Sequence, residues 1–372
     1  MTAFPLAQSR LAALRTRMEA TGSDLVVLGP SSHMAWLSGV HPHGDERPVM
    51  LLVTQDYAGF LMPSLNSASA RQSTDWPFHM WRDDEGPHAA LRDILSACNA
   101  NRPGLSVVLD ETMRTDFALL LLDHLEAPRR RFTQDTVGAL RACKDAAEFE
   151  AIKAAHLLND RAVQAAFDAL REGMTERDLV QIIQDFYGAN GATLEFCSVC
   201  FGPSGAFPHH TPGATRLERD MPVLLDTGCR LNGYPSDMTR CGYFGTPDAT
   251  YAEIFSVVDQ AVQAALAAAR PGALAREVDK AARDVIAAAG YGDRFLHRTG
   301  HGLGIDIHEP PYITATSETR LEAGNVFSIE PGIYLEGRFG MRLEEIVILR
   351  PEGAEIFSNM PRDLIVRPVA GE

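Results

Sequence analysis

The sequence is short of positive charge and of long apolar runs. Its 372 residues carry 34 lysines and arginines against 49 acidic residues, a net charge of −15. We do not expect such a chain to bind nucleic acid, because phosphate contacts draw on clustered cations. No apolar run approaches the roughly 18 residues that a membrane-spanning helix needs, so no membrane role is expected either.

Cysteine is scarce as well. The six cysteines show no framework spacing, which favours a reducing compartment over a disulfide-stapled secreted protein. The single C-x2-C pair, Cys197 and Cys200, lies in an apolar segment. In a strand its two thiols would point to opposite faces, so we expect buried thiols without a function. Residues 1–22 lack the apolar centre of a signal peptide, and a cytoplasmic protein is expected.

What the sequence does contain is apolar material for two cores. Apolar residues make up 45% of the chain, which is longer than one core usually grows. In residues 1–127 helical and strand-like segments alternate, which predicts an α/β N-terminal domain. Strands are expected at 24–29, 48–54 and 105–110, and helices at 88–100 and 113–127.

At residue 128 the composition changes, and we expect a second domain, residues 128–372, that mixes helices and strands. Asp145 with Glu148, and Thr175 with Asp178, form capping boxes that mark two helix starts. Helices are expected at 146–171, 175–188, 250–269 and 275–289, with strands at 194–201, 222–230, 237–244, 325–334 and 341–349.

Two aspartates are expected to meet across a hairpin. Asn232-Gly233 lies between strand-like runs and is a strong hairpin signal. If these two residues form the loop, Asp226 faces Thr239, and Asp237 lies diagonally next to Asp226 on the same sheet face. A bulge would change this register. Isolated aspartates usually cap turns, but two within apolar strands fit that role poorly.

A second carboxylate pair is expected between residues 326 and 349. Folding this segment about Gly337 puts Glu330 opposite Glu344, and like charges across a ladder are destabilising unless a cation neutralises them. Glu345 points to the other face by strand alternation. We expect it to be a structural or solvent-facing residue.

The segment HRTGHGLGIDIHEPP, residues 297–311, lies between the two glutamates and the hairpin. A His-x3-His pair on a helix could clamp a metal, but the three glycines at 300, 302 and 304 disfavour a helix. Four carboxylates and one histidine suit two divalent cations about 3.5 to 4 Å apart. An oxygen-rich ligand set favours Mn(II), Mg(II) or Fe(II), with zinc and cobalt also open.

Histidines also gather in the turn-rich segment 31–48. His33, His41 and His43 occur there with Asp45 and Glu46. No helix or strand is expected to orient them, so we assign them no metal.

Four blocks of this chain resemble the creatinase/prolidase/methionine aminopeptidase family, the M24 metallopeptidases with a pita-bread fold. They occur in the family's order and are FGPSGAFPHHTP (201–212), DTGCRLNGYPSDMTR (226–240), GHGLGIDIHEPP (300–311) and EPGIYLEGRFGMRLEE (330–345). The resemblance implies an α+β pita-bread catalytic domain. Residues 1–127 are similar in layout to the family's creatinase-type N-terminal domain.

The resemblance also implies roles for individual residues. Two divalent ions are expected, with Mn(II) favoured and Co(II), Zn(II) or Fe(II) as alternatives; the implied ligands are Asp226, Asp237, His301, Glu330 and Glu344. Glu330 would also accept the proton of the attacking water. His209 and His308 would contact the substrate and stabilise the tetrahedral intermediate, whereas His297, Arg342 and Tyr312 would bind the substrate.

Within the family this chain looks like the Xaa-Pro peptidases, which act on small peptides and commonly form homodimers. Dipeptidase-type members often place an arginine four residues after the second histidine, to bind the free carboxylate of the substrate. Here that position is Tyr312, which cannot offer a charged fork. Aminopeptidase action on longer peptides therefore gains weight over dipeptidase action, unless Arg342 substitutes.

Two other hypotheses stay open. The chain could act on a small metabolite, through creatinase-like or ectoine-type C–N hydrolysis or as a dimethylsulfoniopropionate lyase. It could also be a non-catalytic relative that binds peptides or histones. The intact ligand set speaks against this last hypothesis and against creatinase itself.

Overall fold

The computed structural model describes residues 3–42 and 44–369, and the chain divides into two compact units, Met1–Arg141 and Ala142–Glu372. The sequence predicted the boundary at 127/128, where a basic run begins. In the structure this run is β6 (Arg129–Phe132), which pairs in parallel with β5 (Ser106–Leu109). A mostly exposed edge strand can carry arginines, so the change in composition marks the edge of a sheet and not a linker.

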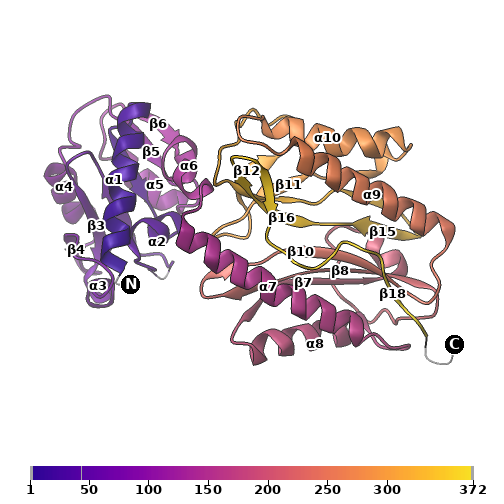
Figure 1. Ribbon diagram of the computed structural model, residues 1–372. Helices are drawn as coiled ribbons and strands as arrows, with labels where there is room; N and C mark the ends of the chain where they lie inside the picture. The colour runs from indigo at the N-terminus through magenta and orange to yellow at the C-terminus, as the bar shows by residue number, and fades with distance from the viewer. Residues whose placement is uncertain (1–2, 43, 370–372) are drawn as a thin grey trace. The chain divides into compact units, whose positions relative to one another are not determined.

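The first unit is an α/β domain built on one six-stranded sheet with the order β4-β3-β2-β1-β5-β6 (Figure 1). Its other strands are β1 (Leu25–Leu28), β2 (Met50–Val53), β3 (Ala58–Pro63) and β4 (Phe78–Trp81), and its helices are α1 (Ala3–Thr21), α2 (Ser32–Ser38), α3 (Ser64–Ala70), α4 (His88–Ala97), α5 (Thr115–Leu122), η1 (Thr133–Asp135) and α6 (Val137–Ala142). Apolar residues of α4 and α5 pack with those of β1, β2 and β5. The expected α/β class is confirmed.

The second unit contains two larger sheets and a two-stranded ribbon. The first sheet has the order β18-β10-β8-β7 and is formed by β7 (Thr193–Phe201), β8 (Met221–Leu231), β10 (Met238–Phe244) and β18 (Ile365–Arg367), with β9 (Tyr234–Pro235) paired to β8. The second has the order β12-β11-β13-β16-β17 and is formed by β11 (Gly300–Gly302), β12 (Glu309–Ile313), β13 (Val326–Ile329), β16 (Glu345–Arg350) and β17 (Gly353–Ile356). The ribbon pairs β14 (Gly332–Leu335) with β15 (Phe339–Arg342).

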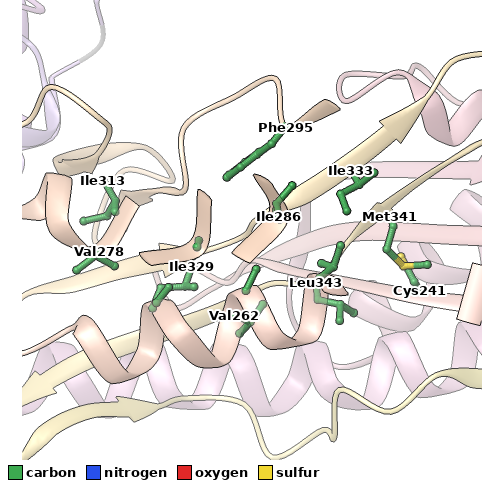
Figure 2. Packing of buried hydrophobic residues seen from close by; sticks show 14 of the residues in the cluster. Cys241, Val262, Val278, Ile286, Phe295, Ile313, Ile329, Ile333, Met341 and Leu343 are labelled. Carbon is green, nitrogen blue, oxygen red and sulfur yellow. The ribbon is translucent and has the colours of Figure 1, made fainter. Parts of the chain in front are cut away.

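Two pairs of helices enclose these strands. The helices are α7 (Ala146–Asp168), α8 (Glu176–Ala189), α9 (Ala249–Ala268) and α10 (Ala275–Ala288), and two short 3-10 helices, η2 (Gly202–Ala206) and η3 (Gly292–Arg294), lie in loops. Helices α7 and α8 pack on β7, β8 and β10, whereas α9 and α10 pack on β13 to β16 (Figure 1). Figure 2 shows the latter core, in which Val262 of α9 and Val278 of α10 lie with Ile329 of β13 and with Leu343, which follows β15.

The helix starts follow the capping residues in the sequence. Asp145 and Thr175 each accept a hydrogen bond from the third residue of α7 and α8, and Glu148 and Asp178 bond back. Both capping boxes satisfy backbone N–H groups that a helix leaves without partners. Among the described residues, no helix is both long and apolar enough to cross a membrane.

Candidate metal centre

The hairpin of β8 and β10 has the register that the sequence predicts. Asn232 and Gly233 form its loop with positive φ angles of 51° and 87°, which a two-residue turn of this kind requires. Leu231 pairs with Tyr234, and Asp226 pairs with Thr239. No shift interrupts the pairing of β8 with β10, so the position of Asp226 relative to Asp237 follows by counting from the loop.

The glutamate pair is also in the predicted register. Ile329 pairs with Glu345 at the end of one ladder, and Gly332 pairs with Arg342 at the start of the next. Both sets of pairs are centred on Gly337. Glu330 and Glu344, which lie between the two ladders, are therefore opposite each other.

Glu345 takes the opposite face and is a structural residue. Its Oε1 accepts hydrogen bonds from Arg240 Nη2 at 2.9 Å and from Arg362 Nη1 at 3.2 Å. Both Glu345 and Arg240 are buried. The charge of Glu345 is therefore neutralised within the fold, whereas the charge of its neighbour Glu344 is turned toward the other carboxylates.

His301 joins the carboxylates from strand β11. One ligand atom each from Asp237, His301 and Glu344 lies within 4.8 Å of the others. His301 Nε2 is 3.2 Å from Glu330 Oε1 and 3.6 Å from Asp237 Oδ2. Its Nδ1 lies 3.1 Å from the carbonyl oxygen of Gly302, which places the proton on Nδ1 and leaves the Nε2 lone pair for a metal.

The carboxylates are electrostatically strained against one another. Burial and the charges of neighbouring carboxylates raise the pKa of Asp237 and of Glu344 well above the usual range. Burial also raises the pKa of Asp226, although Arg342 opposes this. Burial acts on Glu330 in the same direction, but the contact with His301 outweighs it and lowers the pKa of Glu330 to about 2.

The residues present fit divalent cations. Asp226 Oδ1 and Glu344 Oε1 are buried and accept no hydrogen bond within the described part of the chain. The second oxygen of each is oriented by the protein: Arg342 Nη2 donates to Asp226 Oδ2 at 2.6 Å, and Thr239 Oγ1 donates to Glu344 Oε2 at 2.9 Å. Glu345 Oε2 is likewise buried without a hydrogen bond, but Glu345 faces two arginines, whereas the open oxygens of Asp226 and Glu344 belong to carboxylates that repel one another, as expected of ligands to a cation.

Each of the three nitrogens of Arg342 donates a hydrogen bond within the protein. Besides Asp226, it donates from Nε to Thr239 Oγ1 at 3.0 Å and from Nη1 to the Tyr334 hydroxyl at 2.8 Å. The Tyr334 hydroxyl lies 2.7 Å from His297 Nε2. His297 Nδ1 donates to the carbonyl oxygen of Arg298 at 2.7 Å. In the neutral ring Nε2 therefore accepts, and the Tyr334 hydroxyl donates to it. Burial lowers the pKa of His297 accordingly.

The two remaining histidines lie in loops. The ring of His308 packs against that of His301, with centroids 4.1 Å apart. Partial burial lowers the pKa of His308 to about 4, and the neighbouring His301 and Arg298 act in the same direction, so His308 is neutral at neutral pH. His209 follows η2 and is exposed. Its neighbour His210 is bound through Nε2 to the buried Glu176 at 2.8 Å.

Arg298 is a site residue that the sequence reasoning missed. Its guanidinium lies 4.8 Å over the ring of Tyr312, which is 39% exposed, and it acts on the titration of His308. Among the described residues no ion pair with Arg298 is found. The sequence could have indicated Arg298, because it lies between His297 and His301, and a residue between two site histidines lies close to the site.

The histidine segment of the first unit differs from expectation at one point. His33 lies in helix α2 and is buried, and its Nδ1 is 3.0 Å from Arg141 Nη1. It shares a group with Asp110 and Glu111 that has the spacing of metal ligands. The guanidinium of Arg141 donates to this imidazole nitrogen and brings a positive charge to the group. This charge disfavours a metal cation there. His43 lies outside the described residues.

Comparisons with known proteins agree with the geometry. The model of metallopeptidase family M24 matches residues 150–351, and the creatinase/prolidase N-terminal domain matches residues 10–143. The chain therefore belongs to metallopeptidase family M24. It is a hydrolase with the expected two-domain, pita-bread architecture.

Several relatives match over almost their full length. The "Probable dipeptidase PepE" of Mycobacterium tuberculosis is 36% identical, over 97% of this chain and 96% of the relative. The "Xaa-Pro dipeptidase" of Pyrococcus furiosus is 31% identical, over 96% and 100%. The crystal structure of dipeptidase PepE from Mycobacterium ulcerans is 34% identical and covers 98% of this chain and 99% of its own, with a TM-score of 0.93.

Proposed function

We propose that this chain hydrolyses the bond between an N-terminal residue and a following proline in small peptides. The observation that carries the proposal is the grouping of Asp237, Glu344 and His301, to which Glu330 and Asp226 are neighbours, with two buried carboxylate oxygens left open among them. The names of the Xaa-Pro dipeptidase relatives support the specificity. Proline has no amide hydrogen once acylated, so its bond calls for a dedicated site.

The residues proposed to hold two divalent cations are Asp226, Asp237, His301, Glu330 and Glu344. Bound there, the metals would polarise the substrate carbonyl and lower the pKa of a water. Oxygen atoms dominate the ligand set, which favours Mn(II). Co(II), Zn(II) and Fe(II) are the alternatives.

Three side chains are proposed to move or hold protons. Glu330 accepts a proton from the attacking water, the C–N bond breaks, and the proton passes to the proline nitrogen. His209 and His308 donate hydrogen bonds to the oxygen that becomes negative in the tetrahedral intermediate. A neutral His308 still has one N–H group to donate.

Arg342 and His297 receive indirect roles in this proposal. The hydrogen bonds of Arg342 to Asp226 and Thr239 hold two carboxylates in place. His297 keeps Tyr334 turned toward Arg342 and presents its ring to the substrate. Arg342 is buried, which disfavours contact with a substrate carboxylate, so we do not assign Arg342 that contact.

We infer that Arg298 supplies the positive charge that Tyr312 lacks. The guanidinium stacks on an exposed ring, and no ion pair engages it within residues 3–42 and 44–369, so it can bind a free C-terminal carboxylate. Dipeptides are then substrates as well as longer peptides, in line with the dipeptidase names of the relatives.

A substrate panel tests these proposals. Xaa-Pro dipeptides, Xaa-Pro-Yaa tripeptides and longer peptides are assayed with Mn(II), Co(II), Zn(II) and Fe(II), beside creatine, ectoine and dimethylsulfoniopropionate. We expect hydrolysis of the Xaa-Pro peptides and its loss in Glu330→Gln with the fold intact. Arg298→Met should raise KM for dipeptides and leave KM for longer peptides unchanged.

Other outcomes would decide against parts of the proposal. Turnover of one of the three metabolites without peptide hydrolysis would favour the metabolite hypothesis, which the names of the relatives do not favour. A Glu330→Gln protein with near-normal activity would remove Glu330 from the mechanism. Cleavage of tripeptides but not dipeptides would restore Tyr312 as the mark of an aminopeptidase.

We also propose a cytoplasmic homodimer. None of the six cysteines forms a disulfide in the described part of the chain, which supports a reducing compartment. The proposed dimer follows from the resemblance to the family, whose members commonly form homodimers. Light scattering of the purified chain at several concentrations tests it, and a mass of one chain throughout would contradict it.

A further inference from the structure

A buried ion pair lies directly beside the turn that carries His308. Lys144 Nζ donates to Glu309 Oε1 at 2.8 Å, and the two side chains are 1% and 4% exposed. Removing two charges from water costs several kcal/mol, and a well-packed apolar pair of similar size is often as stable. Stability alone therefore does not explain why this position holds an ion pair.

Glu309 connects the pair to the turn before it. It follows His308 and begins β12, where it pairs with Gly302. The turn folds back on the Glu309 carboxylate: Asp306 N donates to Glu309 Oε2 at 3.4 Å, and a Cβ added at Gly304 would lie 2.3 Å from Glu309 Oε1. The carboxylate thus fixes how the turn 303–309 closes.

Lys144 is itself held by backbone. Its N–H donates to the Gly324 carbonyl at 2.9 Å, and its Nζ is 3.4 Å from the carbonyl oxygen of Ala142. Asn325 Nδ2 donates to the same carbonyl at 3.3 Å. Two hydrogen bonds of Lys144, and the bond by which Asn325 holds the Ala142 carbonyl, therefore fix the position of the ammonium group beside Glu309.

We propose that Lys144 is a positioning residue for His308, acting through Glu309. The ammonium pins the carboxylate, the carboxylate closes the turn, and the turn presents the His308 ring against His301 and toward the substrate. The inference rests on the proposed function of His308 as a hydrogen-bond donor to the intermediate. A displacement of about 1 Å can cost a catalytic group about a hundredfold in rate.

The first test compares Lys144→Met with Lys280→Met. Lys280 forms an exposed ion pair with Asp284 and serves as the matched control. For Lys144→Met we expect kcat on an Xaa-Pro peptide to fall by about tenfold or more, with KM and bound metal unchanged. Lys280→Met should keep the wild-type kcat. Equal kcat values for the two variants would overturn the inference.

A double-mutant cycle separates positioning from general damage. If Lys144 acts through His308, the loss of Lys144 in a His308→Ala background should have no further effect on kcat. Two rate losses that multiply would overturn the inference, because they would show that Lys144 acts independently of His308.

A further variant keeps the inference testable if Lys144→Met fails to fold. A further readout keeps it testable if the chain is not a peptidase. Lys144→Met removes the positive charge that balances the buried Glu309 carboxylate, whereas the double variant Lys144→Met, Glu309→Gln removes both charges and should fold, with the same loss of kcat. Imidazole nitrogen NMR signals, assigned by their absence in His308→Ala, should shift in this double variant. Unshifted His308 signals would sink the inference even if no peptide is cleaved, whereas shifted signals in a chain without peptidase activity would sink only the proposed function.

Discussion

Buried ionisable side chains around the site differ in the hydrogen-bond partners that balance their charge. Glu345 accepts hydrogen bonds from two arginines, and Glu344 accepts one from a hydroxyl. Both ring nitrogens of His156 bond to backbone groups. His156 Nδ1 is 2.8 Å from the Ile152 carbonyl, and its Nε2 accepts from Asp237 N at 3.3 Å. A proton on Nε2 would break the second bond, so the fold requires this imidazole to be neutral.

His156 should make stability depend on pH. Burial lowers its pKa to about 4, below the usual value of about 6.5. As the pH falls below 6.5 the unfolded chain binds a proton that the folded chain excludes, so the free energy of unfolding decreases, by about 2 kcal/mol at pH 5. Urea unfolding at pH 7.5 and pH 5 measures this loss.

The variant His156→Gln isolates the effect from the other acidic groups. Because glutamine does not titrate, the variant should lose about 2 kcal/mol less than the wild type between the two pH values. His41→Gln, at an exposed position, should behave as the wild type. Parallel losses in all three proteins would show that His156 is not the source.

At the scale of elements, counting residues from loop tips was enough to pair the ligands. The hairpin register follows from Asn232-Gly233, and the glutamate register follows from Gly337, because strand pairing advances one residue on each side. The contacts of Arg342 could not be obtained this way. They join β15 to β8, β10 and β14, and no local pattern specifies which nitrogen meets which strand.

Elements without an apolar pattern were missed for the same reason. Strand β6 is mostly arginine and lies at the edge of its sheet, where exposed charge is tolerated. Helix α2 has seven residues and is hidden among turn residues, although Ser31 caps it through its side chain. Short or edge elements depend on their neighbours more than on their own sequence.

Two glycines in strands and turns should respond differently to substitution. Gly340 of β15 has no room, since an added Cβ would lie 1.8 Å from the Gly205 carbonyl oxygen in η2, whereas Gly233 has nothing within 4 Å but a φ of 87°. Gly340→Ala should displace η2 and the following His209, and lower kcat by about tenfold or more. Gly233→Ala should cost about 1 kcal/mol in stability and keep the wild-type kcat.

Kinetics and urea unfolding of the two glycine variants check this expectation. A Gly340→Ala protein with normal kcat would show that η2 does not control the loop of His209. A loss of kcat in Gly233→Ala would show instead that hairpin strain reaches the ligands.

At the scale of the whole molecule, the metals should contribute to folding. Ligands that bind only the folded state stabilise it, by about 4 kcal/mol at a concentration a thousandfold above Kd, and here they would also relieve repulsion among the carboxylates. Chelation with EDTA should therefore lower Tm, and Mn(II) should restore it. An unchanged Tm, with metal shown to be removed, would contradict the assigned ligand set.

The two-domain class was visible from the length and from the alternation of elements, but the position of the boundary was not. The strand that closes the first sheet is the basic run itself, and a composition change cannot distinguish an edge strand from a linker. The family match of residues 10–143 agrees with the later division at Arg141.

The neighbouring glutamates 344 and 345 have a consequence for recognising inactive relatives. They point to opposite faces, one toward His301 and the other toward Arg240. Inserting one residue between Gly337 and Glu344 would move Glu344 to the face that meets Arg240 and leave Leu343 at the position that faces His301, although both glutamates would still be present in an alignment. The count from the loop tip is therefore a stricter criterion of an intact site than the presence of its residues.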